Sequence, residues 1–138
     1  MNESSTIPVC RLDHISIAVP NLDLASKFYM ETFDCDISKP IELPDQNMRI
    51  AYVKFSNIRI ELMEATGENS AVTKFLKRYP TGGLHHFCFS TPDATSAAKI
   101  ARSKNIRVIG KGLSHDDKDL FFLHPKDTLG TLIEIEEN

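Results

Sequence analysis

Two histidines and two glutamates recur at almost the same interval along the chain. His14 and His86 are 72 residues apart, and Glu61 and Glu134 are 73 residues apart. Each histidine begins a run in which apolar residues alternate with small or polar ones, as in a half-buried β-strand. Each glutamate lies inside a short run that also predicts a strand. A single strand histidine or glutamate is usually structural, but two matched pairs indicate a shared role.

A set of two imidazoles and two carboxylates is typical of a divalent transition-metal site. Mn, Fe, Co, Ni and Zn accept such nitrogen and oxygen ligands, whereas Ca and Mg prefer oxygen alone. An ion with open positions can stabilise the enolate that forms when a proton leaves the carbon next to a carbonyl group. A glutamate with a suitable pKa can take that proton. The set therefore predicts epimerisation or isomerisation without a redox cofactor.

The segments that must position these residues form an internal repeat. Besides the two histidines, four further identities fall at the offset of 72: Leu12 and Leu84, Pro20 and Pro92, Ala25 and Ala97, Lys27 and Lys99. Chance similarity between two amphipathic strand–helix segments accounts for the apolar matches, but less easily for the paired histidines and prolines. The repeat therefore predicts two copies of one structural unit.

Hydrophobic periodicity predicts the order β-α-β-β-β in each copy. In the first copy we expect a helix over 22–33 and strands over 12–19 and around 37–41, 49–55 and 58–63. In the second copy we expect a helix over 93–104 and strands over 84–91 and near 106–109, 119–123 and 131–136. The apolar side chains of the first helix recur at helical spacing and are expected in the core: Leu24, Ala25, Phe28, Tyr29 and Phe33.

These elements predict an α+β fold with a single domain over 11–138, preceded by a disordered tail over 1–10. Its two βαβββ modules, about 11–65 and 83–137, are joined by a short helix at 70–79 with Ser70 as N-cap. If the mixed sheet curls half-open with polar faces inward and helices outside, His14, Glu61, His86 and Glu134 point into one cavity. The open strand edges favour a homodimer.

Composition limits the classes of function. The chain has 138 residues, 41% hydrophobic and 25% charged, with a formal net charge of −3. It has no basic stripe of the kind that binds nucleic acid, and no apolar run of the roughly 20 residues that span a bilayer. The three cysteines, Cys10, Cys35 and Cys88, follow no disulfide or C-x-x-C pattern. We therefore expect a cytoplasmic protein with a small-molecule substrate.

Five stretches resemble the vicinal oxygen chelate superfamily and, within it, the methylmalonyl-CoA epimerases. They are Leu12–Val19, Ile60–Leu62, Gly67–Leu76, Gly83–His86, and Phe122–Asp127 with Leu132–Glu134. The linker stretch G-E-x-S-x-x-x-K-F-L and the turn H-P-K are similar to the epimerase branch, and the histidines and glutamates to the wider superfamily. The resemblance covers roughly residues 11–137 and implies the glyoxalase fold.

The resemblance also implies roles for particular residues. The metal ligands would be His14, Glu61, His86 and Glu134, the same four that the repeat indicates. Glu134 would also be the acid/base that moves the C2 proton of methylmalonyl-CoA through a metal-stabilised enolate. Some similar relatives carry Gln at the position of Glu61. The implied substrate is an acyl-CoA.

The sequence departs from the epimerase pattern before the third strand of the first module. Family members often have P-E-x-G-V there, whereas this chain has Pro44-Asp45-Gln46-Asn47-Met48. A bacterial relative has a second catalytic base, a glutamate, a few residues later, where this chain has Ile50. Glu61 is our candidate for the second acid/base, by analogy with the glyoxalase I branch, in which metal-bound glutamates transfer the proton.

Three other residues near these motifs receive structural interpretations. His85 adjoins a ligand but points to the opposite face. His124 and Lys126 lie on a turn. Lys126 either lies near the CoA phosphates or is a solvated side chain, and we favour the second interpretation.

Two other functions use the same fold. A lactoylglutathione lyase of the glyoxalase I type would act on a glutathione hemithioacetal with the same ligands. A metal-free module would bind a small molecule in the same cavity.

Overall fold

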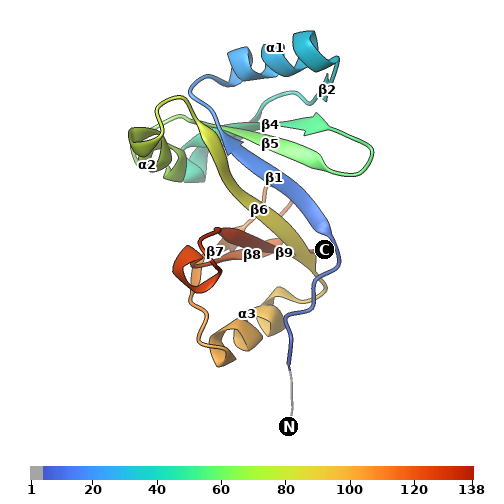
Figure 1. Ribbon diagram of the computed structural model, residues 1–138, viewed down its shortest axis with the longest axis vertical. Coiled ribbons are helices and arrows are strands. Elements are labelled where there is room, and N and C mark those ends of the chain that lie inside the picture. Colours follow the sequence, from blue (N-terminus) through green and yellow to red (C-terminus); the bar gives the residue numbers. More distant parts are fainter. Residues whose placement is uncertain (1–4) are drawn as a thin grey trace. The chain divides into compact units, whose positions relative to one another are not determined.

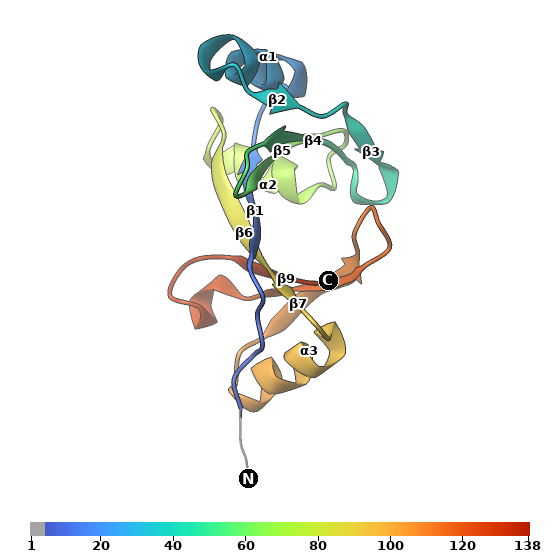
Figure 2. The ribbon, with the colours of Figure 1, turned by 90° about the vertical axis from the view of Figure 1, so that its right-hand side faces the viewer.

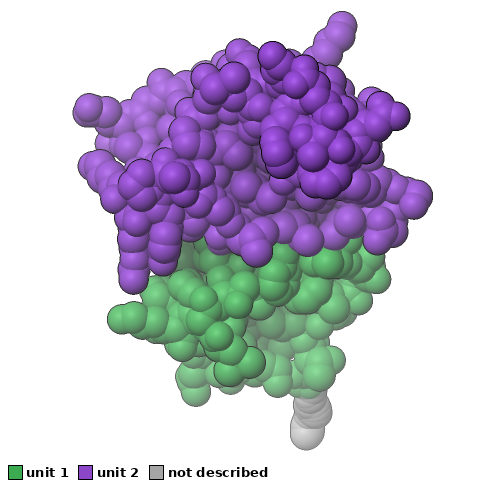
Figure 3. All heavy atoms as spheres, turned by 45° about the horizontal axis from the view of Figure 1, so that its top comes forward, with its two compact units in different colours: residues 1–13, 86–138 green, residues 14–85 purple. Residues whose placement is uncertain are grey.

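The computed structural model describes residues 5–138, and the chain forms two compact units (Figure 3). We call His14–His85 the N-terminal unit, and residues 5–13 with His86–Asn138 the C-terminal unit. Strands and helices follow one another along the chain in almost the predicted order (Figure 1). Each unit has a sheet with both parallel and antiparallel strand pairs, so the predicted α+β fold with a mixed sheet is confirmed.

The sheet of the N-terminal unit has the strand order β2-β4-β5-β1, and β3 also pairs with β4. Its strands are β1 (Leu12–Ala18), β2 (Asp36–Ile37), β3 (Ile41–Leu43), β4 (Met48–Lys54) and β5 (Arg59–Ala65). The central pair β4–β5 is antiparallel, and β5 pairs with β1 in parallel. β5, which carries Glu61, is therefore flanked on both sides by paired strands.

The single strand predicted around 37–41 is wrong. The structure has two short strands, β2 and β3, which both pair with β4 and are separated by residues 38–40. Pro40 lacks a backbone N–H and cannot donate to a strand ladder, which explains the interruption. A 3₁₀ helix, η1 (Pro44–Gln46), connects β3 to β4.

Two helices cover opposite faces of this sheet (Figure 2). α1 (Leu22–Phe33) buries Leu22 against Ala51 and Val53 of β4, and its N-terminus is capped by the side chain of Asn21. α2 (Ala71–Arg78) buries Val72 against the other face, and the Ser70 hydroxyl accepts from the Val72 N–H at 3.1 Å. The predicted linker helix and its N-cap are confirmed.

The predicted core position of the apolar stripe on α1 is wrong for most of its residues. Leu24, Phe28 and Phe33 are 65%, 53% and 61% exposed. Ala25 and Tyr29 are partly buried against the sheet. Because α1 lies on a single sheet layer, only one side of the helix meets the core, and the stripe is wider than that side.

The sheet of the C-terminal unit has the strand order β6-β9-β8-β7. Its strands are β6 (Gly83–Thr91), β7 (Val108–Leu113), β8 (Asp119–Leu123) and β9 (Ile133–Glu137). β9 pairs with β6 in parallel and with β8 in antiparallel orientation. Glu134 on β9 therefore has the same position in this sheet as Glu61 on β5 in the other.

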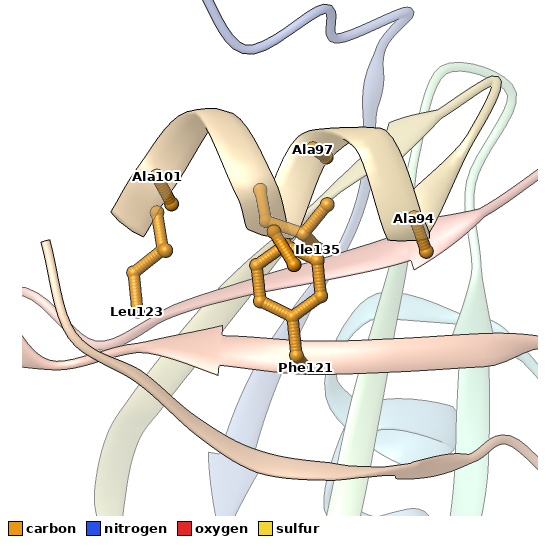
Figure 4. Close-up of a cluster of buried hydrophobic side chains, with 7 residues drawn as sticks. Ala94, Ala97, Ala101, Phe121, Leu123 and Ile135 are labelled. Atoms are coloured by element: carbon orange, nitrogen blue, oxygen red, sulfur yellow. The ribbon is translucent and has the colours of Figure 1, made fainter. Parts of the chain in front are cut away.

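α3 (Ala94–Ser103) packs on the C-terminal sheet through a row of alanines (Figure 4). Ala97 and Ala101 are fully buried and lie over Phe121, Leu123 and Ile135. Small alanine side chains allow the helix backbone to approach the large Phe121 ring closely, at the density of a protein interior. Burying one such ring contributes about 1.5–3 kcal/mol.

At the start of both α1 and α3, a backbone N–H donates to a glutamate of the neighbouring sheet. This shared contact extends the repeat beyond what the sequence predicted. A carboxylate of β5, Glu64, accepts from the Leu22 N–H at 2.9 Å. In the other unit Glu137 of β9 accepts from the Ala94 N–H at 2.9 Å. Each glutamate satisfies a backbone donor that the first turn of a helix leaves unpaired. Arg49 also donates to Glu64 at 2.6 Å, and this hydrogen bond raises the pKa of Arg49.

The disordered tail predicted over 1–10 lies outside the described residues at positions 1–4. Further along, the backbone N–H of Cys10 donates to the Ser90 carbonyl at 2.8 Å, and the Thr91 hydroxyl donates to the Pro8 carbonyl at 2.7 Å. Pro8 and Cys10 are therefore hydrogen-bonded to β6. In the described part of the chain, none of the three cysteines forms a disulfide, and no helix there has the length and apolar character of a membrane span.

A surface ion pair in the C-terminal unit gives a pH-dependent prediction. Arg107 donates to both carboxylate oxygens of Asp127, at 2.8 and 3.1 Å, and its backbone N–H donates at 3.0 Å. These hydrogen bonds lower the pKa of Asp127 well below its ordinary value, and the largest contribution comes from the Arg107 side chain. A carboxylate with a lowered pKa in the folded state stabilises the protein above its unfolded pKa, about 3.9.

We therefore expect Asp127→Asn to destabilise the protein at pH 7 and the difference from wild type to narrow below about pH 4. The sign follows because the unfolded state takes up the proton first as the pH falls. Urea unfolding midpoints of both proteins between pH 7 and pH 3 measure the effect. A difference that widens on acidification would contradict this assignment, and Arg107→Gln should reproduce the Asp127→Asn profile.

Candidate metal centre

In the N-terminal unit the structure brings His14 and Glu61 together. His14 lies on β1, and Glu61 lies on the parallel neighbour β5, where it pairs with Ser16. The Nε2 atom of His14 is 3.7 Å from Oε1 of Glu61. His14 is almost fully buried and Glu61 is partly buried. Alternation along both strands places the two side chains on the same sheet face.

Two hydroxyl groups hold the Glu61 carboxylate. The Ser16 hydroxyl donates to Oε1 at 2.7 Å, and the Tyr52 hydroxyl of β4 donates to Oε2 at 3.3 Å. The guanidinium of Arg59 lies 4.1 Å from the centre of the Tyr52 ring, in a cation–π contact. The ring of His14 meets Tyr52 edge to face at 6.5 Å.

In the C-terminal unit the structure brings His86 and Glu134 together. Nε2 of His86 lies 2.9 Å from Oε1 of Glu134, and both side chains are buried. Glu134 on β9 pairs with Cys88 of β6 and with Phe122 of β8. The His86 ring meets the Phe122 ring edge to face at 5.1 Å.

The two units therefore repeat one local arrangement. A histidine on the first strand is followed two residues later by a small side chain, Ser16 or Cys88. A glutamate pairs with that small residue on the parallel neighbour strand, and an aromatic residue, Tyr52 or Phe122, faces it from the next strand. The duplication predicted from the sequence thus extends to the surroundings of each pair.

Each pair fits the coordination of a transition-metal ion. Ligand bonds from His nitrogen or carboxylate oxygen are about 2.0–2.2 Å, so neighbouring ligand atoms of one ion are about 3.0–3.5 Å apart. The nitrogen–oxygen distances of 2.9 Å and 3.7 Å lie close to this range. Imidazole nitrogen with carboxylate oxygen suits Mn, Co, Ni or Zn.

Other residues singled out in the sequence have structural positions. Ile50 is buried in the core beneath α2 and pairs with Met63, so this position carries no acid/base. The ring of His85 packs edge to face on Phe75 of α2 at 5.2 Å. The imidazole of His124 caps the 3₁₀ helix η2 (Pro125–Asp127) by accepting from the backbone of Lys126, whose side chain is exposed.

The residues that surround Glu61 and Glu134 were not predicted from the sequence. Tyr52 and Phe122 lie on strands that the sequence predicts, but the contact of each ring with a glutamate depends on the register between two strands. A period-two pattern gives the face of a residue but not its partner on the next strand. Arg59 was visible only as a charged residue near Glu61.

Comparison with known proteins identifies the family of this chain. The sequence pattern of the glyoxalase/bleomycin resistance protein/dioxygenase superfamily matches residues 13–123. The chain belongs to this superfamily. Within it, the chain is 35% identical over 130 residues to the ethylmalonyl-CoA/methylmalonyl-CoA epimerase of Cereibacter sphaeroides, covering 92% of this chain and 97% of the relative.

Solved structures of superfamily members agree with this comparison. The methylmalonyl-CoA epimerase of Mycobacterium tuberculosis has a TM-score of 0.85 at 29% identity, covering 99% of this chain and 92% of that chain. A variant of the Streptomyces coelicolor enzyme, in complex with 2-nitronate-propionyl-CoA, has a TM-score of 0.86 at 32% identity, covering 94% and 95%. The glyoxalase fold expected from the resemblance is confirmed.

Proposed function

We propose that this protein is a methylmalonyl-CoA epimerase, which interconverts the two C2 epimers of its acyl-CoA substrate. The observation that carries the proposal is the repeated pair of histidine and glutamate, at 3.7 Å in one unit and 2.9 Å in the other. The chain that holds these pairs is similar over almost its whole length to an epimerase.

His14, Glu61, His86 and Glu134 together bind one divalent ion in this proposal. The donor chemistry of both pairs and their equivalent places in the repeat support a single shared ion. Co, Mn, Ni and Zn are the candidates. When bound, such an ion supplies Lewis-acid stabilisation of negative charge on the thioester oxygen.

Glu134 performs the proton transfer. Its carboxylate takes the proton from C2, the C2–H bond breaks, and the electron pair moves into the C1–C2 bond and onto the thioester oxygen. The resulting enolate is planar at C2, so a solvent water molecule that donates a proton to the opposite face gives the other epimer, and the proton held by Glu134 passes to the hydroxide that remains. No atom or electron is gained or lost overall, and no redox cofactor is required. Glu61, which the sequence also offers as a candidate for the second acid/base, serves as a metal ligand in this scheme.

The remaining parts of the proposal concern the surroundings of the enzyme. We expect a homodimer, because sheet edges that are not paired within a chain favour association, and light scattering after gel filtration measures it. We expect a cytoplasmic location from the cysteine pattern of the sequence. Lys126 is exposed on its turn, and contact with the CoA phosphates is its functional alternative to solvation.

Solvent isotope exchange tests the proposed reaction. The cobalt-loaded protein is incubated with methylmalonyl-CoA in deuterated water, and mass spectrometry follows label at C2 against a sample without protein. We expect rapid incorporation that a chelator stops and added Co restores. Absence of exchange in the loaded protein would refute the proposal, and turnover of methylglyoxal with glutathione in its place would identify a glyoxalase I-type lyase.

A further inference from the structure

We propose that Ser16 and Tyr52 are positioning residues that fix Glu61 as a metal ligand, so that proton transfer falls to Glu134. This inference rests on the proposed function and deepens it, because the sequence offers both glutamates as acid/base candidates. The two glutamates occupy equivalent positions in the repeat. Their neighbours differ, and this difference separates their roles.

Both oxygens of the Glu61 carboxylate accept a hydroxyl group. Ser16 donates to Oε1 at 2.7 Å from β1, and Tyr52 donates to Oε2 at 3.3 Å from β4. Since the donors come from the strands on either side of β5, they hold the carboxylate plane from two directions. A carboxylate oxygen has two lone pairs, so each oxygen can still bind an ion.

The two donors are themselves held in place. Ser16 is fully buried and Tyr52 is 6% exposed. The Arg59 guanidinium lies over the Tyr52 ring at 4.1 Å, and the His14 ring meets its edge. Neither hydroxyl is therefore on a freely moving side chain. Swinging Glu61 toward a substrate carbon would break both hydrogen bonds, whereas binding an ion in place breaks neither.

The other half of the repeat has different chemistry at the two matching positions. Cys88 stands where Ser16 does, and Phe122 stands where Tyr52 does. A phenyl ring has no O–H group, and a thiol is a weak donor; the Cys88 thiol contacts the Phe89 carbonyl at 3.5 Å. Cys88 and Phe122 therefore do not offer Glu134, the carboxylate to which we assign the proton, the two O–H groups that Ser16 and Tyr52 offer Glu61.

Cobalt titration of Ser16→Ala and Tyr52→Phe tests this inference. Loss of a group that orients a metal ligand lowers metal affinity by about 10–100-fold, and we expect the larger loss for Ser16→Ala because its hydrogen bond is shorter. At saturating cobalt, the loss of kcat should be smaller than the loss of cobalt affinity in both variants. Ser16→Thr keeps a hydroxyl and should retain more affinity than Ser16→Ala. Thermal unfolding followed by circular dichroism confirms that each variant is folded.

The matching positions offer the reciprocal variants, Cys88→Ser and Phe122→Tyr. Giving Glu134 the same hydroxyl neighbours should lower kcat while cobalt affinity stays at or above that of wild type. The inference is overturned if Ser16→Ala and Tyr52→Phe keep full cobalt affinity and lose kcat, since Glu61 would then carry the proton. Isothermal titration needs no turnover, so a wild-type protein without epimerase activity would refute the proposed function while the affinities still test the positioning of Glu61.

Discussion

Glu134→Gln is expected to lower kcat for epimerisation and for C2 deuterium exchange by about 10²–10⁴-fold, the usual contribution of a positioned general acid/base. Glutamine has nearly the same shape and keeps an oxygen that can bind an ion, but its amide cannot accept the C2 proton. We therefore expect a large loss of kcat with a much smaller change in cobalt affinity. Initial rates at saturating substrate and metal measure the effect.

Glu137→Gln is a matched control for this variant. Glu137 lies on the same strand, three residues later, and accepts from the Ala94 N–H at the start of α3. A glutamine oxygen can still accept that hydrogen bond, so we expect near wild-type kcat. If Glu134→Gln retains more than about a tenth of wild-type kcat, Glu134 is not the group that moves the proton.

His14→Ala and His86→Ala are each expected to reduce activity by about 10³-fold. Lewis-acid stabilisation is worth several kcal/mol, and each factor of ten in rate is about 1.4 kcal/mol. Because the proposed ion takes ligands from both units, removing either histidine should disable the whole centre. The double variant should then be no less active than the single variants, as for residues that act as one unit.

Treatment with a chelator should lower wild-type activity to the level of the histidine variants, and added Co should restore only the wild type. His85→Ala is the control, because the ring of His85 adjoins His86 in the sequence but packs on Phe75. It should keep metal affinity and activity. Multiplicative losses in the double histidine variant would indicate two independent sites and contradict a shared ion.

The features of the fold and the site that the sequence predicted are those that depend on a single strand or helix. The repeat offset matched His14 with His86 and Glu61 with Glu134 before their sheets were known. The bounds of α1, Leu22–Phe33, were predicted in full because Asn21 caps one end and the chain turns at Asp34. Helix periods and caps are local properties, so one sequence carries them.

What the sequence did not predict depends on neighbours from other elements. Tyr52 reaches Glu61 only because β4 and β5 pair in one register, and a shift of one residue would place it on the other face. The exposure of Phe28 was missed because helical spacing does not tell how many layers cover a helix. The hydroxyl groups that distinguish Glu61 from Glu134 likewise become visible only once strand order is known.

Cobalt-soaked crystals, measured at the cobalt absorption edge, give the most direct test of a shared ion. A shared ion predicts one anomalous peak per chain, at about 2.0–2.2 Å from a donor atom of each of His14, Glu61, His86 and Glu134. Two separate peaks, or one peak that lacks the ligands of either unit, would contradict it.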